Sequence, residues 1–286
     1  MNPVTRLGIV GCGLMGSGIA EVAARSGIDV LVAEATHDAA EEGRRRITAS
    51  LDRGVSSGKL SDEQRDQAFS RLSFTHDLGD MADRQFVIEA VAENRDIKTD
   101  VIRALDKAVE DPAAILATNT SSIPIIDLAI ATERPTQVIG MHFFNPVPVQ
   151  RLVELIPALT TTRETVERTR NFAQQLGKEA IQAPDRSGFV VNALLIPYLL
   201  SAVRMLEAGA AVASDIDRGM ELGCAHPMGP LRLLDLIGLD TAQAVAESMY
   251  EEFKEPLYAP PALLRRMVAA GHLGRKSGHG FYAYDA

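Results

Sequence analysis

The sequence predicts an α/β protein with a doubly wound, mostly parallel sheet, followed by an all-helical domain. Over the first two thirds of the chain, short apolar runs alternate with amphipathic helical patterns. Such alternation is typical of a parallel sheet whose two faces are covered by helices. From the segment APDRSG onward the pattern is helical. We therefore predict a sheet domain over 1–184 and a helical domain over 185–286.

Seven apolar runs are the candidate strands of the sheet domain. They are RLGIV (6–10), DVLVAE (29–34), FVIEAV (86–91), AILATN (114–119), VIGMHF (138–143), ELIPA (154–158) and EAIQAP (179–184). A charged insertion at about 38–68 separates the second run from the third and is longer than a crossover needs. It predicts two helices broken at SSGKLSDE (56–63).

The second domain begins with the most apolar stretch of the chain, GFVVNALLIPYLLSAVRML (188–206). Asn192, Pro197 and Arg204 interrupt this stretch, which favours a buried helix over a membrane span. Either Asp185 or Ser187 is expected to cap that helix.

Composition excludes several kinds of partner. The net charge is −9 and the longest basic run is Arg44-Arg45-Arg46, so we expect no nucleic acid and no membrane partner. Two cysteines, Cys12 and Cys224, are too few for a disulfide framework, which indicates a reducing, cytoplasmic compartment. The chain enters a strand pattern within a few residues, so we expect no signal peptide. No metal site is predicted.

The segment LGIVGCGLMGSGIAE predicts a dinucleotide site. Gly11, Gly13 and Gly16 have G-x-G-x-x-G spacing between a strand and a helix. The first glycine permits the tight turn, the second lets a pyrophosphate approach, and the third lets helix and strand pack closely. Free N–H groups at the start of the helix attract phosphate. The predicted cofactor contacts include the residues between the glycines: Cys12, Leu14 and Met15.

An acidic residue follows the second candidate strand, as the dinucleotide fingerprint requires. Glu34 would accept hydrogen bonds from a ribose diol and repel a 2′-phosphate, and Ala35 rather than arginine comes next. The pattern therefore predicts NAD rather than NADP. The alternative is a glycine turn beside a surface glutamate.

The segment MHFFNPVPVQRLVELI (141–156) contains a candidate catalytic pair. His142 falls at the carboxyl end of a strand, the edge where ligands bind in such sheets, and Asn-Pro then forces a turn. Glu154 lies near the start of the next strand. A carboxylate on one imidazole nitrogen would orient the ring as a base. From the residues alone, a hydrogen-bonded core histidine and a strand-end glutamate remain an equal alternative.

Two more polar residues have both a structural and a functional interpretation. Ser121 of NTSSIP (119–124) follows a strand end, but a serine in that place is usually a helix N-cap. Asn192 lies in an apolar helix, where an unbonded amide is costly, so it is expected to bond either a loop or a ligand.

Nine motifs occur in order along the chain: VGCGLMGSGIAE, AVAEN, NTSS, HFFNPVP, LVE, SGFVVN, HPMGP, LDLIGLDT and GRKSGHGFYAY. Together they resemble the (S)-3-hydroxyacyl-CoA dehydrogenase family, most closely its single-function bacterial 3-hydroxybutyryl-CoA dehydrogenases. The resemblance covers essentially the whole chain, and HFFNPVP and GFYAY are specific to the family. It implies NAD-dependent interconversion of (S)-3-hydroxyacyl-CoA, in particular 3-hydroxybutyryl-CoA, and 3-oxoacyl-CoA.

The resemblance assigns roles to the residues singled out above. His142 would be the general base and Glu154 its orienting carboxylate, while Ser121 and Asn192 would hydrogen-bond the substrate oxygen. Further residues that match cofactor contacts of the family are Glu93, Lys98, Ser121, Asn145 and Lys276.

The resemblance also gives the helical insertion a role in binding coenzyme A. Ser50 matches a family serine, but the family lysine is Ser57 here. Arg53 and Lys59 are the nearest basic residues and are therefore the candidate phosphate contacts. The family's helical domain implies a homodimer formed through 185–286.

Two other functions remain possible from the sequence. One is a dehydrogenase of the same fold that acts on a hydroxy acid without CoA, such as a gulonate-type sugar acid; the insertion and Ser50 disfavour it. The other is a crystallin-like, non-catalytic NAD-binding protein, which would have no need of the His142 base.

Overall fold

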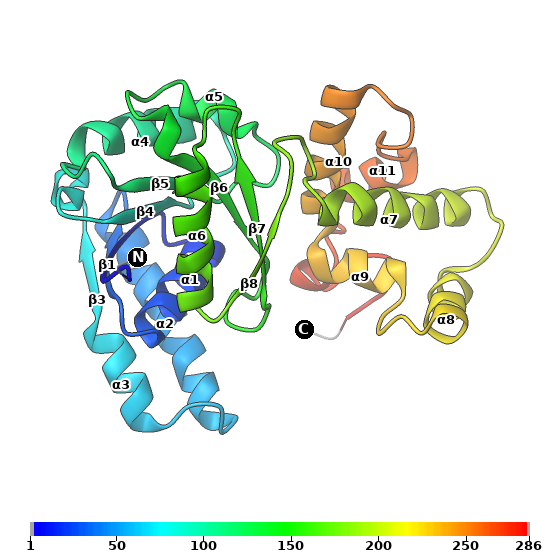
Figure 1. Cartoon of the computed structure of the whole chain (residues 1–286). Coiled ribbons are helices and arrows are strands. Elements are labelled where there is room, and N and C mark those ends of the chain that lie inside the picture. Colours follow the sequence, from blue (N-terminus) through cyan, green and yellow to red (C-terminus); the bar gives the residue numbers. More distant parts are fainter. Residues whose placement is uncertain (1–2, 285–286) are drawn as a thin grey trace. The chain divides into compact units, whose positions relative to one another are not determined.

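The computed structural model describes residues 3–284, and the chain divides into two compact units at Asp185. Each unit is described by itself; the first is coloured blue to green in Figure 1 and the second green to red.

The first unit is built on one sheet, whose strands within the described residues have the order β3-β2-β1-β4-β5-β6-β7-β8. The strands are β1 (Arg6–Val10), β2 (Asp29–Ala33), β3 (Leu72–Thr75), β4 (Phe86–Glu89), β5 (Ile115–Thr118), β6 (Val138–Phe143), β7 (Leu152–Pro157) and β8 (Glu179–Gln182). All neighbours pair in parallel except β6 and β7. The predicted doubly wound, mostly parallel sheet is confirmed.

One strand of the sheet was not predicted, and one pair of strands is the antiparallel exception that a mostly parallel sheet allows. Strand β3 was not predicted, because its four residues lie at the sheet edge and none of them is buried, so they lack an apolar run. Strand β7 is antiparallel to β6 because the connection between Phe143 and Leu152 is shorter than the crossover of about a dozen residues that a parallel pair needs.

Helices of the first unit connect and cover the strands (Figure 1). They are α1 (Leu14–Arg25), α2 (His37–Ser56), α3 (Asp62–Ser70), α4 (Arg95–Ala108), α5 (Ile125–Ala129) and α6 (Arg163–Gln175), with short 3₁₀ turns at Leu78–Met81 and Pro135–Gln137. The predicted insertion is the hairpin α2–α3. Gly58 takes a left-handed turn in its break, and Ser61 with Gln64 forms a capping box that starts α3.

The second unit is helical, as predicted, and contains α7 (Val191–Glu207), α8 (Ala213–Cys224), α9 (Pro230–Ile237), α10 (Leu239–Phe253), α11 (Ala262–Ala269) and a 3₁₀ turn at Arg275–Ser277. Its core gathers on the buried face of α7 at Leu199, Leu200 and Val203. Among the described residues, no helix is both long and apolar enough to cross a membrane.

The predicted cap of α7 is wrong. Left-handed backbone at Gly188 and Phe189 separates both candidates from the start of the helix, whose N-cap is Val190. The Asp185 carboxylate instead accepts the N–H groups of Ile125 and Ile126, at 2.7 and 2.9 Å, and so caps α5. The hydroxyl of Ser187 lies 3.2 Å from that of Ser248 in its own unit.

Two buried aspartates, which the sequence did not single out, organise the second unit. Asp217 caps α9 through the N–H groups of Leu231 and Arg232. Asp235 accepts the N–H groups of Phe281 and Tyr282. The hydroxyls of Tyr282 and Tyr284 in the motif GFYAY donate to Asp217 and Asp235, at 2.7 and 2.9 Å. These two tyrosines therefore supply donors that the buried carboxylates need.

Candidate active site

The His142 and Glu154 side chains form a buried hydrogen-bonded pair. They are register partners on the antiparallel strands β6 and β7, and Nδ1 of His142 lies 2.7 Å from Oε2 of Glu154. Because a carboxylate only accepts, Nδ1 carries the proton of this bond. The other ring nitrogen, Nε2, lies 3.1 Å from the hydroxyl oxygen of Ser121. The geometry therefore leaves Nε2 as the atom able to take a proton.

Ser121 lies in the turn that follows β5 and does not cap a helix. Its backbone N–H donates to Oε1 of Glu93 at 2.9 Å, and the same oxygen accepts the hydroxyls of Thr120 and Ser122 at 2.5 and 3.0 Å. The N-cap interpretation of Ser121 is therefore wrong, since the Asp185 carboxylate accepts the first N–H groups of α5. The turn presents the Ser121 hydroxyl to the histidine.

The glycine turn has the form that a pyrophosphate requires. Gly11 has a φ of +92°, and a Cβ there would meet the carbonyl oxygen of Ala90 at 2.7 Å. A Cβ on Gly16 would meet the carbonyl oxygen of Gly11 at 1.8 Å, whereas one on Gly13 would meet nothing within 4 Å. Open space therefore lies over Gly13, where helix α1 begins without a side-chain cap. These residues fit a dinucleotide.

Glu34 follows β2 and turns its carboxylate to the glycine turn, where it accepts the N–H of Cys12. The Cys12 thiol is buried below this contact. Burial, reinforced by the Glu34 charge, raises the pKa of the thiol to about 12. The neighbouring Leu14 is exposed and Met15 half-buried, so of the three intervening residues only Cys12 belongs to the core.

Three further predicted cofactor residues follow strands at the same edge of the sheet. Glu93, beyond β4, holds the turn that carries Ser121. Lys98 of α4 is fully buried, with its ammonium 2.8 Å from Oε1 of Glu89. Asn145 is exposed and lines a small cavity of about 220 Å³ together with Ser50 and Arg53. Direct contacts of these residues with a cofactor stay predictions.

The three residues predicted to bind coenzyme A lie around one cavity. Ser50, Arg53 and Lys59 line a space of about 450 Å³ between the α2–α3 hairpin and the segment after Asn145. Arg25, the last residue of α1, also lines this cavity. The sequence analysis missed it, because basic residues are common in the last turn of a helix, where they interact favourably with the helix dipole. The cavity has a cationic wall in a chain of net charge −9.

Two predicted site residues belong to the second unit. Asn192 lies half-buried in the first turn of α7. Lys276 follows α11, and its ammonium lies 2.7 Å from Oδ2 of Asp240. Their predicted roles toward substrate and cofactor stay predictions.

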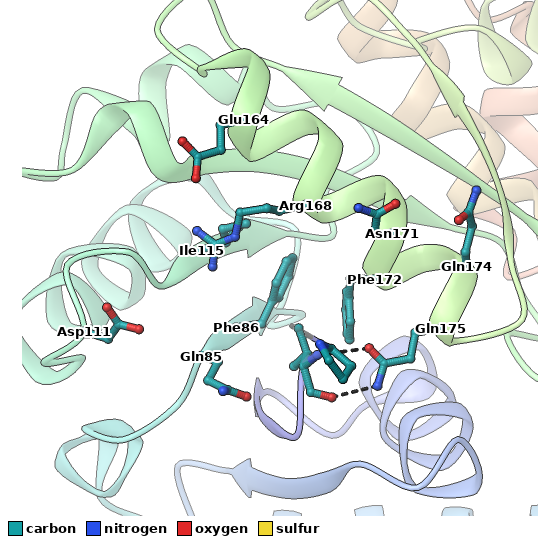
Figure 2. A pocket seen from close by; sticks show the side chains of 12 residues that line it. Gln85, Phe86, Asp111, Ile115, Glu164, Arg168, Asn171, Phe172, Gln174 and Gln175 are labelled. Carbon is teal, nitrogen blue, oxygen red and sulfur yellow. Dashed lines mark hydrogen bonds between the residues drawn. The ribbon is translucent and has the colours of Figure 1, made fainter. Parts of the chain in front are cut away.

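A cavity of about 800 Å³ in the first unit lies at the opposite edge of the sheet (Figure 2). Phe86 and Ile115, at the starts of β4 and β5, are among the residues that line it. The Gln175 side-chain amide accepts the N–H of Val4 at 3.1 Å and donates to the Val4 carbonyl oxygen at 2.7 Å. None of its twelve lining residues is a histidine, serine, lysine or cysteine. The cavity therefore lacks the side chains expected of the predicted base and hydroxyl group, and its size does not make it the active site.

The site combines three features at one edge of a doubly wound sheet: the glycine turn, an acidic residue after β2 and a buried His–Glu pair. This combination defines a nicotinamide-dependent oxidoreductase. Residues 6–186 match the family model of the 3-hydroxyacyl-CoA dehydrogenase, NAD binding domain, and residues 188–284 match that of the C-terminal domain. The chain belongs to the 3-hydroxyacyl-CoA dehydrogenase family.

Similar proteins agree with this assignment. The chain is 56% identical to a 3-hydroxybutyryl-CoA dehydrogenase of Mycobacterium tuberculosis over 284 residues, 99% of each chain. The crystal structure of M. tuberculosis FadB2 matches with a TM-score of 0.98 and 55% identity over 99% of this chain and 100% of that one. The (S)-3-hydroxybutyryl-CoA dehydrogenase PaaH1 of Ralstonia eutropha matches with a TM-score of 0.94 and 44% identity over 99% and 100%.

Proposed function

We propose that the protein interconverts (S)-3-hydroxybutyryl-CoA and acetoacetyl-CoA with NAD as its redox partner. The observation that carries the proposal is the hydrogen-bonded series Ser121–His142–Glu154 beside a dinucleotide-binding edge. The names of the relatives support the four-carbon substrate.

The residues divide the chemistry between them. In the oxidation, Nε2 of His142 takes the proton of the 3-hydroxyl group, and Glu154 stabilises the positive charge that the ring acquires. The Ser121 hydroxyl, 3.1 Å from Nε2, hydrogen-bonds the oxygen that loses the proton. When bound, NAD supplies the two-electron acceptor. The glycine turn and Glu34 are the residues that would hold it.

Coenzyme A is the proposed ligand of the cavity beside α2. Arg53 and Lys59 supply two positive charges, and Arg25 a third that is shared with Glu21 at 3.2 Å. This arrangement replaces the family lysine at Ser57, because guanidinium and ammonium groups both bind phosphate. The hydroxy-acid alternative without CoA would leave these charges without a ligand.

A homodimer formed through the second unit is also part of the proposal. Large apolar side chains stand exposed on three of its helices, with Leu194 on α7 74% and Leu222 on α8 72% exposed and Leu236 on α9 about half. Exposed apolar side chains of this size are common at interfaces between subunits. A cytoplasmic location is proposed from the free thiols Cys12 and Cys224. Light scattering after size exclusion tests the dimer, and a monomer would contradict it.

The decisive assay is oxidation of NADH with acetoacetyl-CoA by the parent protein and by His142→Ala. We expect turnover by the parent and its loss in the variant, while titration of NADH fluorescence shows equal binding by both. Binding without turnover in the parent would favour the non-catalytic reading. Turnover of a sugar acid, but not of acetoacetyl-CoA, would favour the dehydrogenase that needs no CoA.

A further inference from the structure

Lys178, directly before β8, carries a buried cation that the proposed chemistry does not use. The residue is 7% exposed. Within the described residues its ammonium donates to the carbonyl oxygens of Val147 and Gln150, the second at 2.7 Å, and to no carboxylate. Burial, reinforced by the charge of Arg25, lowers the pKa of Lys178. Because burying a charge without an opposite charge is costly, we look for the role of this ammonium in the two bonds that it makes.

Both carbonyl groups belong to the segment 144–151, which joins β6 to β7 and thus the two strands of the catalytic pair. Pro146 and Pro148 have no backbone N–H, so the segment cannot continue the hydrogen-bonded ladder of the sheet. An internal bond closes its turn, from the N–H of Gln150 to the carbonyl oxygen of Pro146 at 3.0 Å. The carbonyl groups of Val147 and Gln150 therefore need a donor from another part of the chain, and Lys178 supplies it.

On its other side the segment packs against helix α1. Val147, at 1% exposed, is the only buried residue within 144–151. A Cβ on Gly18 of α1 would lie 2.9 Å from the Cβ of Val147, so the missing side chain at Gly18 is what lets the segment approach. Helix α1 is the helix that the glycine turn opens. The segment is thus held between the dinucleotide-binding helix and the ammonium of Lys178.

The segment forms a wall of both predicted ligand sites. Asn145, a predicted cofactor contact, lines the cavity of about 220 Å³ next to α1. Pro146, Pro148 and Val149 line the cavity of about 450 Å³ that is proposed for coenzyme A. Lys178 lines neither of these two cavities. It can therefore influence them only through the segment that it holds.

We infer that Lys178 is a positioning residue, whose ammonium holds the segment 144–151 and through it places Asn145 and the proline wall of the coenzyme cavity. His142 and Glu154 are held by the pairing of β6 with β7 and do not depend on this contact. Lys178 should therefore govern the binding of ligands and not the chemical step. The kinetic consequence rests on the proposed function, whereas the geometric part concerns the chain alone.

Steady-state kinetics separate the two effects. In Lys178→Met, the KM for acetoacetyl-CoA and for NADH should each rise about tenfold, because the ligands must then order the segment as they bind. The value of kcat should change less than about twofold, since the reacting groups stay in place. Lys178→Arg keeps donors for both carbonyl oxygens beside a cavity of about 220 Å³, and each KM should stay within about threefold. A fall in kcat with unchanged KM, or equal losses in both variants, would overturn the inference.

Arg134→Met is the matched control. Arg134 is also a cation that donates to backbone carbonyl groups, those of Val109 and Asp111, both at 2.8 Å, and it pairs with Asp106. It precedes β6 and so lies at the opposite edge of the sheet from His142. The variant is expected to lower thermal stability and leave both KM values in place. A rise in KM as large as that of Lys178→Met would reflect general destabilisation and would contradict the inference.

Hydrogen exchange measured by mass spectrometry provides a readout that does not depend on turnover. Peptides that cover 144–151 should exchange faster in Lys178→Met than in the parent protein, and at the parent rate in Arg134→Met. Peptides that cover 109–113 should show the reverse, because Arg134 bonds two carbonyl groups there. Unchanged exchange at 144–151 in Lys178→Met would show that Lys178 does not hold the segment.

If Lys178→Met does not fold, Lys178→Gln takes its place with the same expectations, because its amide is polar but too short to reach both carbonyl oxygens. If the parent protein does not reduce acetoacetyl-CoA at all, the proposed function fails. Hydrogen exchange at 144–151 then still decides whether Lys178 positions the segment.

Discussion

His142 and Glu154 face each other as direct register partners across β6 and β7, with Nδ1 of the imidazole 2.7 Å from Oε2 of the carboxylate. Glu154 follows His142 by twelve positions in the chain, and the antiparallel pairing of the two strands brings them together. Because the pair is built on strands rather than on loops, the ring is held rigidly with Nε2 toward Ser121.

The pair yields the first prediction. Replacing Glu154 by Gln keeps a hydrogen-bond acceptor but removes the charge that stabilises the protonated ring. We expect kcat to fall about 100-fold or more, the usual scale for general acid–base groups, with little change in NADH affinity. Steady-state kinetics and fluorescence titration measure the two quantities. A variant with full kcat would show that Glu154 is structural only.

Glu34 is expected to determine the choice of cofactor. In Glu34→Ser, the loss of a charged acceptor at the glycine turn should raise the KM for NADH about 10- to 100-fold, because a hydrogen bond to a charged group contributes about 1.5–3 kcal/mol. Removing the negative charge should also improve the use of NADPH. The comparison is kcat/KM for both cofactors. Glu41→Ser, at a half-buried position of α2 where the carboxylate pairs with Arg44, is the control and should change neither.

The cavity beside α2 is expected to bind only the nucleotide part of the substrate. In Arg53→Ala/Lys59→Ala the KM for acetoacetyl-CoA should rise about tenfold or more, the scale of lost charge-assisted bonds. The KM for acetoacetyl-pantetheine, which lacks the nucleotide, should stay the same. Arg103→Ala removes an exposed charge from α4 and serves as the control. An equal rise for both substrates would place the coenzyme elsewhere.

The two thiols are expected to react very differently. Burial raises the pKa of the Cys12 thiol to about 12, so it stays protonated at pH 7 to 9 and does not form the reactive thiolate. A disulfide reagent should therefore modify the exposed Cys224 in the native protein and reach Cys12 only after unfolding. Cys224→Ser should abolish the native reaction. Rapid native labelling of Cys12 between pH 7 and 9 would show that the glycine turn opens.

The cap of α5 provides a test of stability. Asp185→Ala removes an acceptor for the N–H groups of Ile125 and Ile126 and should lower the free energy of unfolding by about 1 kcal/mol. Asp185→Asn keeps an acceptor oxygen and should lower it less. Denaturant unfolding measures both. Equal losses would mean that the charge, rather than the acceptor, stabilises this helix.

Much of the fold followed from the sequence, because local patterns encode it. The apolar runs that become β1 and β6 and the break at 56–63 in the insertion can all be recognised without distant contacts. The glycine turn could also be recognised from the sequence, because backbone geometry requires a glycine at Gly11 and Gly16, and the approach of a pyrophosphate favours one at Gly13. The short strand β3 was not predicted, because an edge strand without buried residues carries no apolar pattern.

For the site, the residue types and, through the family resemblance, their expected roles could be read from the amino-acid sequence. The partner of each buried side chain became known from the three-dimensional structure. It paired His142 with Glu154 through strand register, and it moved Asp185 from the expected cap of α7 to that of α5. It also turned Lys98 inward onto Glu89. The physical reason is that a charged or polar side chain buried by folding must find partners wherever the fold brings them, and chain spacing does not encode those distances.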